Sequence, residues 1–147
     1  MDAISLLKDD HRKVEKLFQE IEKAPAGKRD QLYKEINKEL TIHAELEEKL
    51  FYPAADAAKQ THELALEAME EHKQMKIVLA DLEQADKKTE TWLAGLKVLM
   101  EDVQHHVKEE ETELFPKIKK EVLSEQQLKE VGQQMEDLKT QLLAMVR

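Results

Sequence analysis

Histidines and glutamates at helical spacing are the residues of this 147-residue chain that could do chemistry. Apolar residues recur with the period of an α-helix, and four of the six histidines occupy positions that this period assigns to the core. His43 is followed four residues later by Glu47, which lies on the same helix face. His106 is followed by Glu110 in the same way. Because a buried carboxylate is costly without a counter-charge, this pattern indicates cations bound among imidazoles and carboxylates.

The chain also contains an internal repeat. The segment around His11 aligns with the segment around His72 at an offset of 61 residues. The segment from His43 to Pro53 aligns with the segment from His106 to Pro116 at an offset of 63 residues. The sequence therefore predicts a duplicated helical hairpin.

Five helical segments are expected from the apolar spacing, at about residues 2–24, 28–52, 61–85, 89–116 and 124–145. Pro53 and Pro116 are expected to end the second and fourth helices, because proline removes a helical hydrogen bond. Short connections predict an all-α, up-down-up-down antiparallel four-helix bundle with an additional C-terminal helix. Residues 1–120 would form the bundle, and residues 121–147 an amphipathic helix that packs on the bundle or on a partner.

Helix arithmetic places the four core histidines at one level of this bundle. At a rise of ~1.5 Å per residue, each lies about 20–24 Å from the tip of its hairpin. Both tips lie at the same end of an up-down-up-down bundle. The imidazoles of His11, His43, His72 and His106 therefore converge on the axis, with Glu47 and Glu110 about one turn further along.

Metal binding is the chemistry that this donor set favours. The chain has no cysteine, so any metal must be held by imidazole and carboxylate, which suit iron, manganese or zinc. Two octahedral ions offer about twelve positions, and four histidines and two bridging carboxylates leave about four of them open. Zinc favours four-coordinate sites, so two iron ions are the best match, with manganese or zinc as alternatives. The candidate ligands are His11, His43, Glu47, His72, His106 and Glu110.

Composition limits the other classes of function. The formal net charge of −9 argues against nucleic-acid binding, which needs a basic surface. No apolar run approaches the ~18 residues of a membrane span, and no secretory signal is visible, so a cytoplasmic location is expected. Glu48 and Glu111 are interpreted as part of a solvated face, with a role as outer partners of the ligands as the alternative.

The motifs resemble those of the hemerythrin-like family, the HHE cation-binding domains, over about Ile4 to Lys119. The resemblance depends on His43-x-x-x-Glu47-Glu48-x-x-Phe51-x-Pro53, on His106-x-x-x-Glu110-Glu111-x-x-x-Phe115-Pro116, and on the preceding pairs Asp10-His11 and Glu71-His72. It implies a non-haem di-iron centre in which the six candidates are the iron ligands and the two glutamates bridge. Oxygen-carrying hemerythrins have two histidines four residues apart on the third helix. Here the neighbours of His72 at that spacing are Ala68 and Lys76, so one ligand is missing and the centre is more open to peroxide or nitric oxide.

The expected function is that of a di-iron protein that binds dioxygen, peroxide or nitric oxide for sensing, storage or detoxification. Two alternatives stay open at this point: a di-iron enzyme that acts on peroxide or in iron-centre repair, and a structural or zinc-binding helical interaction module. The expected partner is a small molecule such as dioxygen, with neither nucleic acid nor a membrane. A homodimer through the C-terminal helix is a further alternative. The walls of the ligand pocket are predicted to be Leu40, Met75, Leu99 and Val103.

Overall fold

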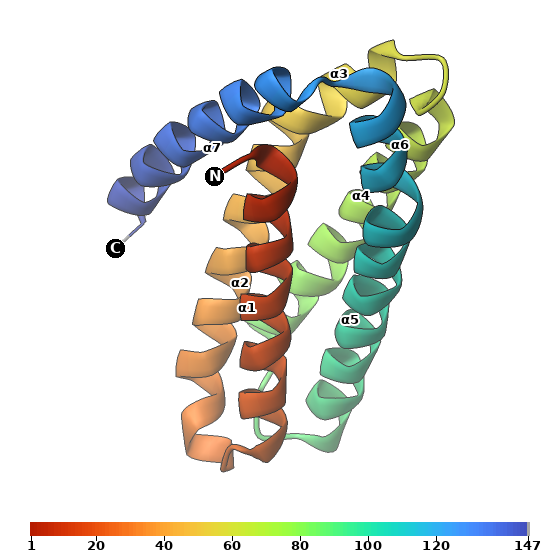
Figure 1. Cartoon of the computed structure of the whole chain (residues 1–147). Coiled ribbons are helices and arrows are strands. Elements are labelled where there is room, and N and C mark those ends of the chain that lie inside the picture. The colour runs from red at the N-terminus through yellow and green to blue at the C-terminus, as the bar shows by residue number, and fades with distance from the viewer. Residues whose placement is uncertain (147) are drawn as a thin grey trace.

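A computed structural model describes residues 1–146 and has the predicted all-α architecture. Four long antiparallel helices form an up-down-up-down bundle, with both hairpin tips at one end (Figure 1). They are α1 (Ala3–Lys23), α2 (Arg29–Leu46), α4 (His62–Gln84) and α5 (Glu90–Glu109). A further long helix, α7 (Glu125–Met145), runs beside α1 and α2. Within the described residues, no helix is long and apolar enough to cross a membrane.

Side-chain caps fix where several helices begin. Asp2 accepts a hydrogen bond from the backbone of the first turn of α1, and Thr89 does the same for α5. Ser124 begins α7 with a complete capping box. Thr61 precedes α4, but its hydroxyl donates to the carbonyl of Ala55 (2.7 Å) and does not cap the helix.

The prediction that Pro53 and Pro116 end their helices was wrong. The π-helical turn Glu47–Phe51 links α2 to α3 (Tyr52–Ala57), and the turn Glu110–Leu114 links α5 to α6 (Phe115–Lys117). Both prolines lie in the first turn of the helix after the π turn, where their missing N–H is tolerated. A third π turn, Ile118–Val122, follows α6 and ends this continuous helical segment. Such turns are frequent at functional sites, and here two of them begin at the predicted glutamate ligands.

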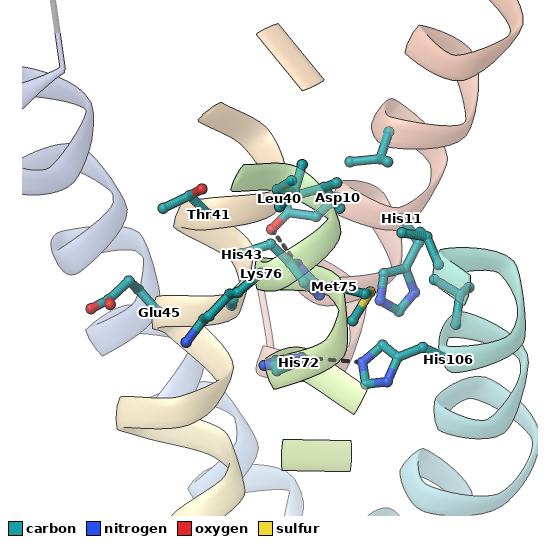
Figure 2. Close-up of a pocket in the computed structure, with 15 residues that line it drawn as sticks. Asp10, His11, Leu40, Thr41, His43, Glu45, His72, Met75, Lys76 and His106 are labelled. Carbon is teal, nitrogen blue, oxygen red and sulfur yellow. Dashed lines mark hydrogen bonds and ion pairs between the residues drawn. The ribbon is translucent and has the colours of Figure 1, made fainter. Parts of the chain in front are cut away.

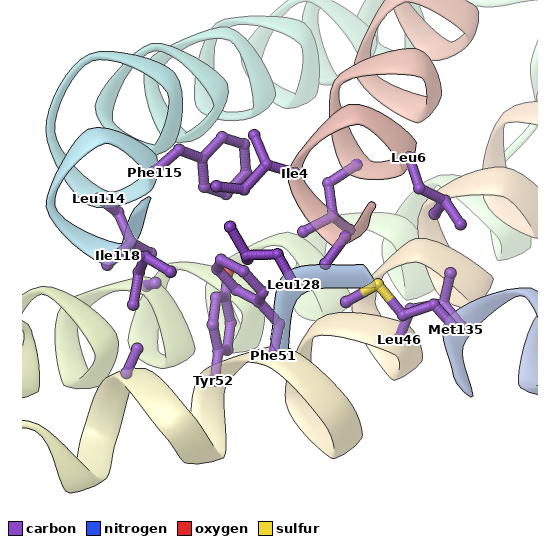
Figure 3. Close-up of a cluster of buried hydrophobic side chains, with 14 of the residues drawn as sticks. Ile4, Leu6, Leu46, Phe51, Tyr52, Leu114, Phe115, Ile118, Leu128 and Met135 are labelled. Atoms are coloured by element: carbon purple, nitrogen blue, oxygen red, sulfur yellow. The ribbon is translucent and has the colours of Figure 1, made fainter. Parts of the chain in front are cut away.

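Two hydrophobic clusters lie on either side of the histidine level. On α1, Leu7 belongs to one cluster and Val14 to the other, and His11 lies between them. The cluster toward the hairpin tips contains Trp92, whose indole N–H donates to the carbonyl of Leu82 (2.9 Å). The other cluster joins the π turns to α7, and its members include Phe51, Tyr52, Leu114, Phe115, Ile118, Leu128 and Met135 (Figure 3). Packed apolar layers therefore hold the polar level from both sides.

Helix α7 packs on the bundle through one face. Leu128 and Met135 are buried in the cluster shared with the π turns, whereas Leu143 and Met145 are exposed. Between the two buried residues, Gly132 lies so close to the start of α1 that a Cβ atom would approach the backbone oxygen of Met1 to 2.3 Å. The absence of a side chain at position 132 is thus what allows this contact.

We expect Gly132→Ala to destabilise the protein by about 1–3 kcal/mol, the usual effect of overpacking. In a helix interior, alanine is more favourable than glycine by about 1 kcal/mol. The new Cβ atom would, however, clash with the backbone of residues 1–3, which cannot rotate away as a side chain can, so the steric effect dominates. Urea unfolding checks this result. Gly27→Ala is the control, because a Cβ there meets no atom within 4 Å. Equal stability of both variants would contradict the close packing of α7.

Candidate metal centre

The structure brings all six predicted ligand residues together in the middle of the bundle. Each is buried, with at most 7% of its surface exposed. Their donor atoms form two adjacent groups, His11–His43–Glu47–Glu110 and Glu47–His72–His106, whose members lie within 4.8 Å of one another. Figure 2 shows the four imidazoles converging from α1, α2, α4 and α5. The arrangement has the composition of two adjoining metal sites.

The first half of the centre is formed by α1 and α2 with the two glutamates. His43 Nε2 lies 3.0 Å from Glu47 Oε1, one helical turn away on the same helix. His11 Nε2 lies 3.2 Å from Glu110 Oε1, which comes from the other hairpin. Two imidazoles and two carboxylates from both hairpins can therefore reach one ion.

The second half is formed by α4 and α5, and it shares both glutamates with the first. Glu47 Oε1 lies 3.2 Å from His72 Nε2 and 3.8 Å from His106 Nε2. Glu110 Oε2 lies 3.4 Å from His106 Nε2, while its other oxygen faces the first half. Both carboxylates thus lie between the imidazoles of the two halves.

A carboxylate binds the outward nitrogen of every one of these imidazoles. The Nδ1 atoms of His11, His43, His72 and His106 lie 2.7, 3.0, 2.8 and 2.6 Å from oxygens of Glu111, Asp10, Glu48 and Glu71, respectively. The pairs follow the internal repeat, since each histidine of one hairpin has its counterpart in the other. For Glu48 and Glu111 the structure favours the alternative of an outer partner over a solvated face, because each reaches back to a histidine of the opposite hairpin.

These outer carboxylates decide where the histidine protons lie. An ionised carboxylate can only accept a hydrogen bond, so each Nδ1 carries a hydrogen and a neutral imidazole presents its Nε2 lone pair to the centre. Such carboxylate–histidine pairs orient ligands in metal sites.

Several inward atoms are buried and, among the described residues, have no hydrogen-bond partner: His11 Nε2, His43 Nε2, both oxygens of Glu47, and Glu110 Oε1. Buried acceptors without donors are costly, and a cation satisfies them together. The residues present fit bound metal ions.

The charges of this cluster alter the pKa values of its members. Burial opposes the charged form of His43, but the charge of Glu47 and the hydrogen bond to Asp10 raise its pKa to about 10. The pKa of His106 is likewise raised well above its usual value despite its burial, chiefly by Glu110. Burial would raise the pKa of Glu47, yet the nearby His43 holds it well below its usual range. Without metal, protons on imidazoles therefore compensate the buried carboxylates.

Tyr52 is a site residue that the sequence reasoning missed. Its hydroxyl donates to Glu110 Oε2 and lies 3.2 Å from Nε2 of both His72 and His106. The π turn has i→i+5 hydrogen bonds, so Tyr52, five residues after Glu47, comes onto the face of the centre. A regular helix would favour position 51 for that face. The apolar spacing along the chain contains no signal for this turn.

The two halves differ at this position of the repeat. The counterpart of Tyr52 is Phe115, whose ring is stacked on His11 with the centroids 6.0 Å apart. Burial, with the charge of Glu110, raises the pKa of Tyr52 well above its usual value, so the hydroxyl keeps its proton. One half is therefore closed by an apolar ring, whereas the other contains a proton donor.

A cavity of about 160 Å³ adjoins the imidazoles on the side of the hairpin tips (Figure 2). Its apolar walls include Val14, Leu40, Met75, Leu79 and Val103, and its rim between α2 and α4 carries Thr41, Glu45 and Lys76. Three of the four predicted wall residues are thus confirmed. The fourth, Leu99, is buried in the core and does not line the cavity.

The remaining histidines lie outside the centre. His62 is exposed beside Asp56 at the start of α4. His105 is 65% exposed and lies 3.6 Å from Glu71 and 3.4 Å from Glu109 on the surface.

Comparisons with known proteins show which family the chain belongs to. The chain is 28% identical to a hemerythrin HHE cation-binding domain-containing protein from Mycobacterium kansasii, whose crystal structure superposes with a TM-score of 0.85 and covers 97% of this chain and 87% of that one. It is 31% identical over 130 residues to a protein named DNA nickase from Nostoc sp. (strain PCC 7120), a match that covers 86% of this chain. This chain spans 36% of the length of that relative. The sequence model of the hemerythrin HHE cation-binding domain family matches residues 2–118. The chain therefore belongs to the hemerythrin HHE cation-binding domain family and is a metal-binding protein.

Proposed function

We propose that the protein holds two iron ions and binds dioxygen or a related small oxidant, peroxide or nitric oxide, for sensing, storage or detoxification. His11 and His43 would hold one ion, His72 and His106 the other, and Glu47 and Glu110 would bridge them. The observation that supports this most directly is a set of buried ligand atoms that have no hydrogen-bond partner among the described residues. They belong to His11, His43, Glu47 and Glu110, and Glu47 also faces His72 and His106. Two imidazoles and two carboxylates per ion leave positions of an octahedral iron open for a small ligand, whereas the same four would complete the four-coordinate site that zinc favours.

The open position of the centre is proposed to lie in the half of His72 and His106. Lys76, one turn after His72, cannot supply the ligand missing there, because its ammonium pairs with Glu48 (3.1 Å). The cavity beside the imidazoles has mainly apolar walls and would accommodate a small uncharged molecule. Bound iron would supply the electrons for a reaction with an oxidant.

The contribution of the protein to such a reaction is control of protons and of access. Tyr52 holds a proton on its hydroxyl oxygen beside the open half, while Glu110 accepts its hydrogen bond. The four outer carboxylates keep a proton on each Nδ1 and so keep every Nε2 available. This proton donor favours peroxide breakdown as the second candidate function, since cleavage of peroxide consumes protons at oxygen.

Metal analysis with optical spectra before and after exposure to oxygen tests the proposal. We expect two irons per chain and a visible band that develops when the reduced protein meets dioxygen, peroxide or nitric oxide. His43→Ala should remove the band and His62→Ala should keep it. Full occupancy by zinc without a redox response would contradict the proposal and support an interaction module. Repeated turnover of peroxide would favour an enzyme over a carrier or sensor. Tyr52→Phe should then slow this turnover while its iron content stays unchanged.

A further inference from the structure

Helix α7 reaches the metal centre through one polar contact. The ammonium of Lys139 lies 2.7 Å from Asp10 Oδ1, and the other oxygen of this carboxylate, Oδ2, lies 3.0 Å from Nδ1 of His43. A continuous chain of hydrogen bonds therefore runs from the C-terminal helix to an imidazole of the centre. We propose that Lys139 is a positioning residue, through which docked α7 holds His43 in its metal-binding orientation.

The position of Lys139 is fixed by the packing of its helix. Leu128, Gly132, Met135 and Lys139 follow one another at spacings of three and four residues, so they lie on one face of α7. The first three contact the bundle, and the fourth continues that face to the level of the histidines. The side chain of Lys139 is 26% exposed, and its stem is therefore largely covered. Docking of α7 thus places the Lys139 ammonium within reach of Asp10.

Asp10 needs this cation. The carboxylate is 4% exposed, and a buried carboxylate with a single imidazole partner keeps an oxygen that requires a donor. Lys139 fills this place, so both oxygens of Asp10 are engaged and the carboxylate cannot turn. A fixed carboxylate in turn fixes the ring of His43, as outer partners do in metal sites generally.

The other hairpin lacks this device, which makes the two halves unequal. The counterpart of Asp10 in the repeat is Glu71, which binds His106 at 2.6 Å. Its second oxygen faces His105 at 3.6 Å, and this imidazole is 65% exposed. No lysine of the described residues pairs with Glu71. The inference rests on the proposed metal function, and it assigns control by α7 to the half that contains His43.

The test is a titration of the full-length apo-protein with cobalt(II) without oxygen, followed by the visible absorption of bound cobalt. Wild type should bind two equivalents. Lys139→Met keeps the apolar part of the side chain and removes the charge. In this variant we expect one of the two cobalt ions to bind about 10-fold more weakly and the spectrum to change. This factor is the lower end of the usual loss of metal affinity when an outer partner is replaced. Lys139→Arg should restore the affinity and the spectrum of the wild type. Lys129→Met, at an exposed position of α7, should bind cobalt as the wild type does.

A double-mutant cycle with Asp10→Asn shows whether Lys139 acts through Asp10. If it does, Asp10→Asn and the double variant bind cobalt with equal affinity, because the lysine has nothing left to hold. Additive losses would overturn the inference. So would an unchanged titration and spectrum of Lys139→Met, even if its melting temperature fell, because the contact would then serve stability alone. Failure of wild type to bind cobalt would contradict the proposed function together with this inference.

Discussion

Glu47→Gln is expected to weaken binding of both metal ions by about 100-fold or more, a larger loss than replacement of an outer partner causes. One oxygen of this side chain lies within 4 Å of His43, His72 and His106, so it is shared by the two halves. No other described residue that is 0% exposed carries a charge. Glutamine keeps the volume and removes the charge that bridging needs. Metal content after gel filtration and a titration of the apo-protein measure the loss.

The same substitution should leave the metal-free fold intact. Removal of the buried carboxylate also removes its desolvation cost, which offsets part of the loss of its ion pair with protonated His43. We therefore expect the free energy of unfolding of the apo variant near pH 7 to fall by only about 1–3 kcal/mol below that of the wild-type apo form. Glu35→Gln, on the outer side of α2 where it pairs with Lys38 (3.1 Å), is the matched control for charge and should bind metal normally. Retention of two tightly bound ions by Glu47→Gln would refute the bridging role.

The histidine level could be predicted because it depends only on helix period and hairpin length. The duplicated His–Glu pairs needed no tertiary detail, since a spacing of four residues puts both side chains on one face wherever the helix lies. Their meeting at the axis followed from equal distances to the hairpin tips. The six candidate residues therefore occupy one buried cluster in the structure, while their role as ligands stays a prediction.

Tyr52 and the outer carboxylates could not be predicted in the same way. Tyr52 reaches the centre only because the chain leaves the α-helical period at Glu47, and a periodic pattern has no means of indicating such a turn. Glu48 lies in the π turn that follows α2, and it contacts His72 on α4. This contact depends on how the two segments are rotated against each other. Lys139 depends on how α7 docks, which the stripe of α7 alone left open between the bundle and a partner.

The metal-free protein is expected to lose stability as the pH rises from about 7 toward 10. The folded-state pKa of His43 is raised to about 10, whereas an unfolded histidine titrates near 6.5. The folded state therefore binds more protons than the unfolded state between these values, and stability falls with pH by up to about 1.4 kcal/mol per unit for each such proton. Below about 6.5 this contribution is fully present. Urea unfolding of apo-protein at intervals between pH 6.5 and 10 measures the slope.

Two comparisons isolate the cause of this slope. With metal bound, the imidazoles carry no proton on Nε2, so the metal-bound protein should show no such loss over the same range. In apo Glu47→Gln the slope should be markedly smaller, because the charge of Glu47 is the strongest influence that raises the pKa of His43. Stability of the wild-type apo form that stays constant or increases from pH 6.5 to 10 would mean that protons do not replace cations in the empty centre. The buried carboxylates would then require another source of compensation.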